Sequence, residues 1–151
     1  MTQALSSSEI ADRLKDNFAD AITEIKKDCL IIKGDSLLDI ASFLKNTPDL
    51  DFDYLSCITC VDFKDYFELV YQLLSIKHNH SLVLKTQCYQ RDKPVVNSMV
   101  DLWKGADFQE REIYDLMGIR FKGHPNMKRI FLWDGFQGHP LRKENNNDAE
   151  N

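Results

Sequence analysis

The chain has 151 residues, of which 43% are hydrophobic and 28% are charged, and this size and composition predict one globular domain with short tails. No uncharged apolar run approaches the about 20 residues of a membrane-spanning helix, and the N-terminus shows no basic and apolar export signal. The formal net charge of −5 disfavours a protein that binds nucleic acid over its whole surface.

The first third of the chain predicts a helix, a hairpin and a second helix. Apolar residues recur at every fourth position through residues 8–21, as on the buried face of a helix. Residues 22–26 and 29–33 are apolar or β-branched stretches on either side of a polar pair, which is typical of a β-hairpin. Ser36 can then cap a second helix, which Pro48 prevents from continuing.

The middle of the chain changes from helical to strand periodicity. Residues 54–63, 66–77 and 81–91 are rich in Val, Ile, Thr, Tyr and Phe and are joined by short polar connections. They predict a three-stranded antiparallel meander. Residues 98–103 and 107–117 then predict a short and a longer helix, the second ended by glycine. The predicted fold class is α+β: a two-layer domain of helix, β-hairpin, helix, three-stranded antiparallel meander and helix, followed by an extended C-terminal tail.

The stretch from residue 119 to residue 143 differs from this body in composition. Three glycines and two prolines leave no room for a long helix or strand. The stretch has six Lys and Arg residues against one Asp, and its nine large apolar side chains are too many for a solvated linker. We predict an α+β domain over 1–118, an extended basic and aromatic docking segment over 119–143, and a disordered tail over 144–151.

Two sets of residues could in principle bind a metal. Cys57 and Cys60 form a C-x-x-C pair, but residues three apart on a strand point to opposite faces, so we expect buried thiols. Without an export signal, all four cysteines are expected to be free. His124 and His139 each stand at the centre of a Gly-His-Pro triplet, which fixes the ring orientation. A third ligand is missing, so metal binding is the minor alternative.

Charged residues also cluster at 110–115. Glu112 and Asp115 share a helix face and could serve acid–base catalysis. The sequence offers no adjacent nucleophile, phosphate loop or ligand set, which favours a solvated or interface-facing stripe.

Residues 103–143 closely resemble the signature region of the C subunit, or 30 kDa subunit family, of respiratory complex I, NADH-quinone oxidoreductase. The matching stretches are ADFQEREIYDLMGI at 106–119, GHP at 123–125, KRI at 128–130 and GHPLRK at 138–143. Several rare motifs in a fixed order make this a specific signal, although it covers about 40 residues of the chain.

The resemblance implies a protein of the peripheral arm that carries no cofactor, no metal and no catalytic residue of its own. FMN, Fe-S clusters and quinone would be bound by partner subunits, which pass electrons from NADH to quinone while protons are translocated. The implied partners are the large quinone-site subunit, known as the D subunit, and other proteins of the peripheral arm. The implied location is peripheral, on the cytoplasmic face of the cell membrane.

The resemblance also implies roles for individual side chains. Arg129 and Arg142 are expected to pair with carboxylates of the large quinone-site subunit. The residues assigned to the subunit interface are Glu110, Arg111, Glu112, Tyr114, Asp115, His124, Arg129, His139, Arg142 and Lys143.

Two alternatives remain open from the sequence. The chain could be the equivalent subunit of a related membrane-bound hydrogenase or of a ferredoxin- or F420-linked oxidoreductase. It could also be a nucleic-acid-binding adaptor that uses its basic and aromatic segment. The net charge of −7 over residues 1–119 opposes the approach of phosphate and disfavours this second alternative.

Overall fold

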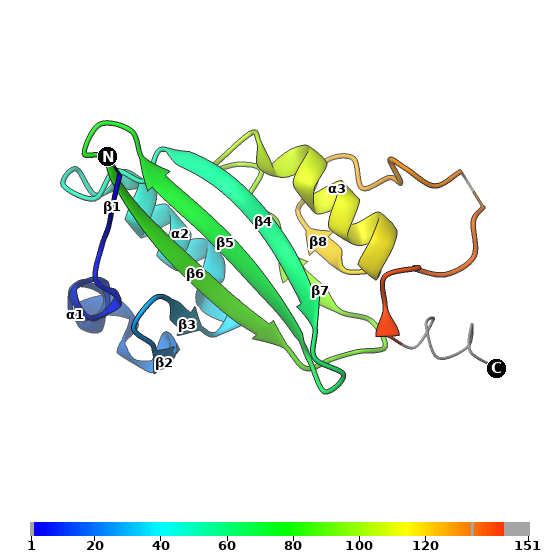
Figure 1. Cartoon of the computed structure of the whole chain (residues 1–151), viewed down its shortest axis with the longest axis horizontal. Coiled ribbons are helices and arrows are strands. Elements are labelled where there is room, and N and C mark those ends of the chain that lie inside the picture. Colours follow the sequence, from blue (N-terminus) through cyan, green and yellow to red (C-terminus); the bar gives the residue numbers. More distant parts are fainter. Residues whose placement is uncertain (1, 134, 144–151) are drawn as a thin grey trace.

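The computed structural model describes residues 2–133 and 135–143 and has a mixed β-sheet at its centre (Figure 1). The strands lie in the order β2-β3-β6-β5-β4, and a short β1 pairs in parallel with the start of β6. Their bounds are β1 Gln3–Ala4, β2 Ile22–Ile25, β3 Leu30–Ile32, β4 Tyr54–Asp62, β5 Phe67–Ser75 and β6 His80–Cys88.

The two predicted β units join through the parallel pairing of β3 with β6. Leu30 lies opposite Leu84, and Ile32 lies opposite Thr86. The hairpin of β2 and β3 and the meander of β4, β5 and β6 are both antiparallel, as predicted. Along β6, buried residues alternate with half-buried ones, which is the pattern of a sheet packed on one face.

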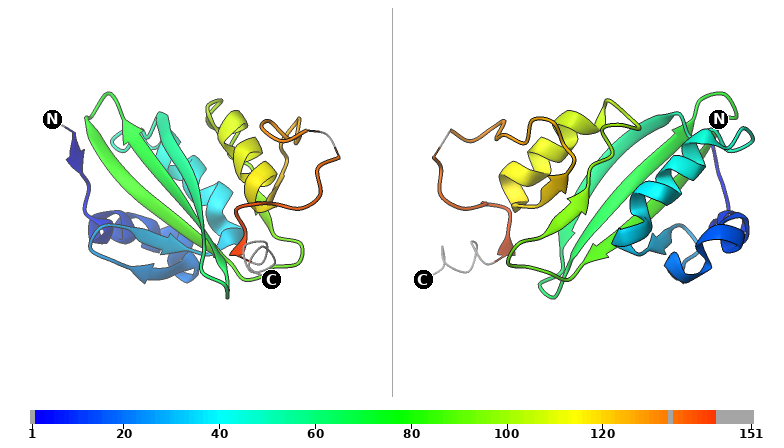
Figure 2. Two further views of the ribbon diagram at one scale, coloured as in Figure 1. Left: turned by 45° about the vertical axis from the view of Figure 1, so that its right-hand side comes forward. Right: turned by 180° about the vertical axis from the view of Figure 1, so that it is seen from behind.

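Helices cover one face of this sheet. Helix α2 (Leu37–Asn46) lies behind the strands of the meander in Figure 1 and in front of them in the right-hand view of Figure 2. Helix α3 (Ala106–Met117) lies beside β4, at the edge of the sheet. Helix α1 (Ser7–Phe18) packs beside β2, and short 3₁₀ turns, η1 (Ala19–Ala21) and η2 (Gly34–Ser36), follow α1 and precede α2. The buried apolar residues of the three helices and of the sheet form one core. The predicted α+β class is confirmed.

The first helix ends earlier than the sequence predicts, whereas the last helix ends where it is expected. Helix α1 ends at Phe18, because residues 19–21 tighten into η1. Helix α3 ends as predicted, with Gly118 in the left-handed conformation at φ 78°.

The short helix predicted at residues 98–103 is wrong. The structure has a strand, β7 (Val95–Asn97), followed by turns. Long-range hydrogen bonds hold these turns: Ser98 Oγ and Met99 N donate to the Glu110 carboxylate at 2.6 Å each, and the Trp103 indole donates to Phe52 O at 3.0 Å. The helix propensity of residues 98–103 does not decide their structure, because hydrogen bonds to buried groups that are distant along the chain fix the backbone.

Strand β7 pairs in parallel with β8 (Arg120–Lys122), which lies inside the segment predicted to be extended. The side chains of Ile119 and Phe121 are buried in the common core. The domain boundary at residue 118 stays a prediction, and the tail predicted to be disordered, 144–151, lies outside the described residues. Among the described residues, no helix is both long and apolar enough to span a membrane.

Candidate functional site

Residues 124–133 and 135–143 form a segment that contacts helix α3 at several points (Figure 1), and one buried carboxylate accounts for much of its path. Oδ2 of Asp115 accepts three consecutive backbone N–H groups, from Ile130 at 3.1 Å, Phe131 at 2.8 Å and Leu132 at 3.1 Å. Oδ1 accepts Nη1 of Arg129 at 3.1 Å. Because the Asp115 side chain is fully buried, these bonds replace water completely and fix the backbone turn at 129–132.

Arg129 extends this contact to the far part of the segment. Its Nη2 donates to the carbonyl oxygen of Gly138 at 2.9 Å, and its guanidinium lies 5.6 Å from the ring centre of Phe136. Within this chain Arg129 forms an ion pair with Asp115, and its expected pairing with a partner's carboxylate stays a prediction. The reason for the pair with Asp115 is the buried carboxylate on α3, whose charge needs a compensating cation.

The motif at 138–143 closes the C-terminal end of α3. The last carbonyl groups of a helix have no partner within the helix. Here the carbonyl oxygen of Asp115 accepts the His139 ring at 3.1 Å, that of Leu116 accepts Leu141 N at 2.9 Å, and that of Met117 accepts Arg142 Nε at 2.6 Å. Three successive carbonyl groups are thus satisfied by residues more than twenty positions away.

Gly118 makes this closure possible. A Cβ atom at this position would lie 2.6 Å from Cδ2 of His139 and 2.9 Å from Nη2 of Arg142. A side chain would therefore displace both residues, and the positive φ of Gly118 would strain it further.

The N-terminal half of α3 holds the start of the segment. His124 Nδ1 accepts the backbone N–H of Asn126 at 3.0 Å, so the ring proton lies on Nε2, which faces Oδ1 of Asp107 at 3.0 Å. Arg111 donates to the carbonyl oxygens of Lys128 at 3.1 Å and Arg129 at 3.4 Å. Both Gly-His-Pro triplets thus hold a ring against α3, whereas the sequence predicted a fixed ring orientation without naming its partner.

The other predicted interface residues lie in varied surroundings. Glu110 points into the core, where burial raises the pKa of its carboxyl group. Glu112 is exposed, and the Tyr114 ring lies between His139 and Arg120, at 6.0 Å from the His139 ring and 5.6 Å from the guanidinium. An interface role for these residues stays a prediction.

Lys143 reveals a contact that the sequence analysis missed. Its backbone N–H donates to Asp62 Oδ2 at 3.0 Å, and Asp62 also forms a two-bond ion pair with Arg91 at 2.8 and 3.1 Å. Burial opposes ionisation of Asp62, but these donors and the N–H of Lys64 lower its pKa to about 2. No local motif marks Asp62, because its partners come from three separate parts of the chain.

Large apolar side chains are exposed on and beside the segment. Phe131 and Trp133 follow the backbone held by Asp115, Phe108 projects from α3, and Leu141 lies in the motif that closes the helix. Each exposes more than half of its surface. Exposed apolar groups gathered in this way are typical of a protein–protein contact surface.

The sequence's candidate metal ligands do not converge. Cys57 pairs with Gln72 and Cys60 with Leu69, so the register of β4 and β5 places the two thiols on opposite faces. Burial raises the pKa of Cys60 to about 12, which keeps it protonated at neutral pH. Over residues 2–133 and 135–143, no three His, Cys, Asp or Glu side chains are grouped as metal ligands.

Asp115→Asn should lower the free energy of unfolding at pH 7 by about 3–5 kcal/mol, because Arg129 loses a buried charge partner. Asp49→Asn, which breaks an exposed pair with Arg13, is the matched control and should have little effect. Urea titrations of both variants, followed by circular dichroism, measure the difference.

The decrease in the free energy of unfolding at acid pH provides a second test of the same variant. Burial raises the pKa of Asp115, but three backbone N–H donors and Arg129 outweigh it and hold the pKa below its ordinary value. Its stabilising contribution is therefore complete above about pH 4 and is lost as the pH falls through the folded pKa. Asp115→Asn should lack this part of the pH dependence. An unchanged decrease at acid pH would contradict the role assigned to Asp115.

Gly118→Ala should destabilise the protein by more than about 1 kcal/mol, since it adds backbone strain to the clash with His139. Gly105→Ala is the control, because a Cβ atom there meets nothing within 4 Å and the backbone is already helical. Thermal unfolding compares the two. Equal melting temperatures would show that the segment does not pack against Gly118 as described.

Two comparisons with known proteins agree on the family. The family model described as "Respiratory-chain NADH dehydrogenase, 30 Kd subunit" matches residues 30–151. The NADH-quinone oxidoreductase C subunit of Roseiflexus castenholzii is 36% identical over 148 residues, covering 93% of this chain and 84% of that protein. That of Cupriavidus taiwanensis is 40% identical over 124 residues, covering 76% and 62%.

A solved structure shares the fold. One chain of the membrane-bound sulfane sulfur reductase, described as an archaeal respiratory membrane complex, superposes with a TM-score of 0.74 at 23% identity and covers 91% of this chain and 84% of that chain. The resemblance seen in the motifs at 106–143 is confirmed by the match over residues 30–151. The chain belongs to the family of the 30 kDa subunit of the respiratory-chain NADH dehydrogenase, complex I.

Proposed function

We propose that this chain is a non-catalytic subunit of the peripheral arm of an NADH-quinone oxidoreductase, and that it docks on the large quinone-site subunit through the segment held by Asp115. In this role the chain supports electron transfer from NADH, through FMN and Fe-S centres in other subunits, to quinone, coupled to proton translocation. The complex would lie at the cytoplasmic face of the membrane, with this subunit attached indirectly.

The observation that carries the docking proposal is the exposure of Phe131 and Trp133 on a backbone that is itself fixed. The Asp115 carboxylate binds the N–H groups of residues 130–132, so Phe131 projects from a hydrogen-bonded turn and Trp133 directly follows it. Burial of such rings against a partner contributes about 25 cal/mol per Å² of apolar area. Because the turn is already ordered, little conformational entropy is lost on docking.

Two charged residues of the motifs have hydrogen-bond partners within this chain. Arg129 and Arg142 use their guanidinium groups within the chain, on Asp115 and on the last carbonyl groups of α3. We propose that they shape the docking surface and that the apolar side chains make the principal contacts. A basic group beside one of those rings, Arg111 at 5.8 Å from the Phe108 ring centre, then favours an acidic rim on the partner.

We further propose that this chain itself holds no flavin, iron–sulfur cluster or quinone. The opposite orientation of Cys57 and Cys60 supports this, because a cluster or a zinc ion needs several convergent thiolates. The alternative is that this chain is the equivalent subunit of a related membrane-bound complex. The fold that it shares with a chain of the sulfane sulfur reductase supports this alternative. The relatives at 35–40% identity, which are named as C subunits of NADH-quinone oxidoreductase, favour NADH as the electron donor.

Trp133→Ala should reduce the amount of assembled complex on native gels, because a central aromatic anchor is worth about 2 kcal/mol or more in a stable interface. Ile76→Ala is the matched control, since both side chains are 68% exposed and Ile76 follows β5, outside the segment. Quinone-reductase activity should fall in proportion to the assembled complex. Normal assembly with lost turnover would instead place Trp133 at the chemistry and contradict the non-catalytic role.

A further inference from the structure

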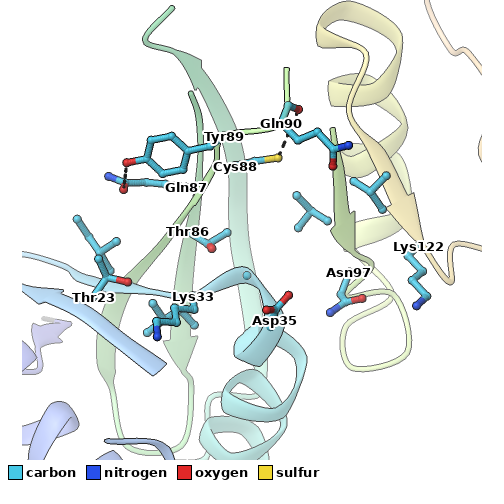
Figure 3. Close-up of a pocket in the computed structure, with 15 residues that line it drawn as sticks. Thr23, Lys33, Asp35, Thr86, Gln87, Cys88, Tyr89, Gln90, Asn97 and Lys122 are labelled. Carbon is cyan, nitrogen blue, oxygen red and sulfur yellow. Dashed lines mark hydrogen bonds between the residues drawn. The ribbon is translucent and has the colours of Figure 1, made fainter. Parts of the chain in front are cut away.

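A second surface, separate from the segment beside α3, is a groove of about 700 Å³ at the end of the sheet (Figure 3). Its walls come from three places: the turn from β3 into η2, the last residues of β6 with the chain that follows, and the β7–β8 pair. Its volume lies in the range of about 300–1,000 Å³ that is usual for ligand sites.

The β7 wall of the groove is an open strand edge. Arg120 N donates to Pro94 O at 3.0 Å, and Ser98 N donates to Lys122 O at 2.8 Å, so these alternate positions face β8. Because the direction of backbone groups alternates along a strand, the N–H and C=O groups of Val95 and Asn97 point away from β8. Both residues line the groove, and among the described residues the β7–β8 sheet has no third strand.

The floor of the groove holds a second group without a partner. Thr86 is 1% exposed, and its Oγ1 has no hydrogen-bond partner among the described residues. It lies beside Gly34, where a Cβ atom would come to 3.6 Å from this oxygen, and both residues line the groove. A buried hydroxyl without a partner costs stability unless a bound group supplies the bond.

We infer that this groove binds an extended peptide segment of a neighbouring subunit, which adds a strand to the free edge of β7. The complement of a row of unpaired backbone donors and acceptors is another extended backbone. Lys33 and Lys122 stand at the rim with Asp35, so the charge balance favours an acidic residue in that segment. The inference rests on the chain being a subunit of a larger complex, but not on the docking of Phe131 and Trp133.

Val95→Pro is the direct test, because proline removes the N–H that points into the groove and leaves both bonds to β8 in place. Val95→Ala is the control, since it shortens the same side chain and keeps the N–H. Full-length variants are titrated onto membranes from cells that lack this subunit. Val95→Pro should bind about 2- to 10-fold more weakly than Val95→Ala, which corresponds to the loss of one hydrogen bond.

Several outcomes overturn the inference. Equal binding of the two variants would contradict the added strand but would leave the proposed function intact. If Val95→Pro binds normally but Lys33→Ala and Lys122→Ala bind more weakly, the groove binds an anionic ligand and not a peptide strand. If the wild-type chain itself does not bind these membranes, the proposed function fails as well.

Hydrogen exchange of the wild-type chain keeps the inference testable if Val95→Pro does not fold. In the free chain, the amide of Val96 should be protected by β8, whereas those of Val95 and Asn97 should exchange fast. In the assembled complex, all three should be protected. Fast exchange of Val95 and Asn97 in both states, or slow exchange in both, contradicts the added strand.

Discussion

The arrangement of the C-terminal segment depends on the burial of one charge, the carboxylate of Asp115. A carboxylate removed from water is costly unless donors surround it, and here four donors do so: three backbone N–H groups and one guanidinium. The donors come from residues 129–132, so satisfying this charge fixes the course of a segment that has little regular structure of its own.

Buried polar groups at the end of α3 likewise fix the path of the segment. A helix that ends inside a protein leaves carbonyl groups that need partners, and the His139–Arg142 motif supplies them. The two Gly-His-Pro triplets attach the segment at both ends of α3, and Arg111 and Arg129 attach it between them. The motifs that identify the family are therefore also the residues that hold the segment to the body, and the exposed aromatic residues lie between these points of attachment.

The sequence predicts the α+β class, the hairpin, the meander and the long helices, because these elements have clear local periodicity. It fails at residues 98–103, where Glu110 and Phe52 fix the backbone from a distance. It also misses β7, β8 and the parallel pairing of β3 with β6, since a three-residue strand carries almost no periodic signal. For the site, the sequence finds the side chains but not their partners: Asp115 and Arg129 stand in separate motifs, and their pairing is a property of the fold.

The central claim is that Asp115 orders the segment within the free chain, before any partner binds. Hydrogen exchange of the amides of Ile130, Phe131 and Leu132 in the isolated full-length protein measures this directly. We expect slow exchange in the wild-type chain and fast exchange in Asp115→Asn, with the amides of β5 equally protected in both. Fast exchange of the three amides in the wild-type chain would contradict the claim, because the segment would then be ordered by its partner and not by its own helix.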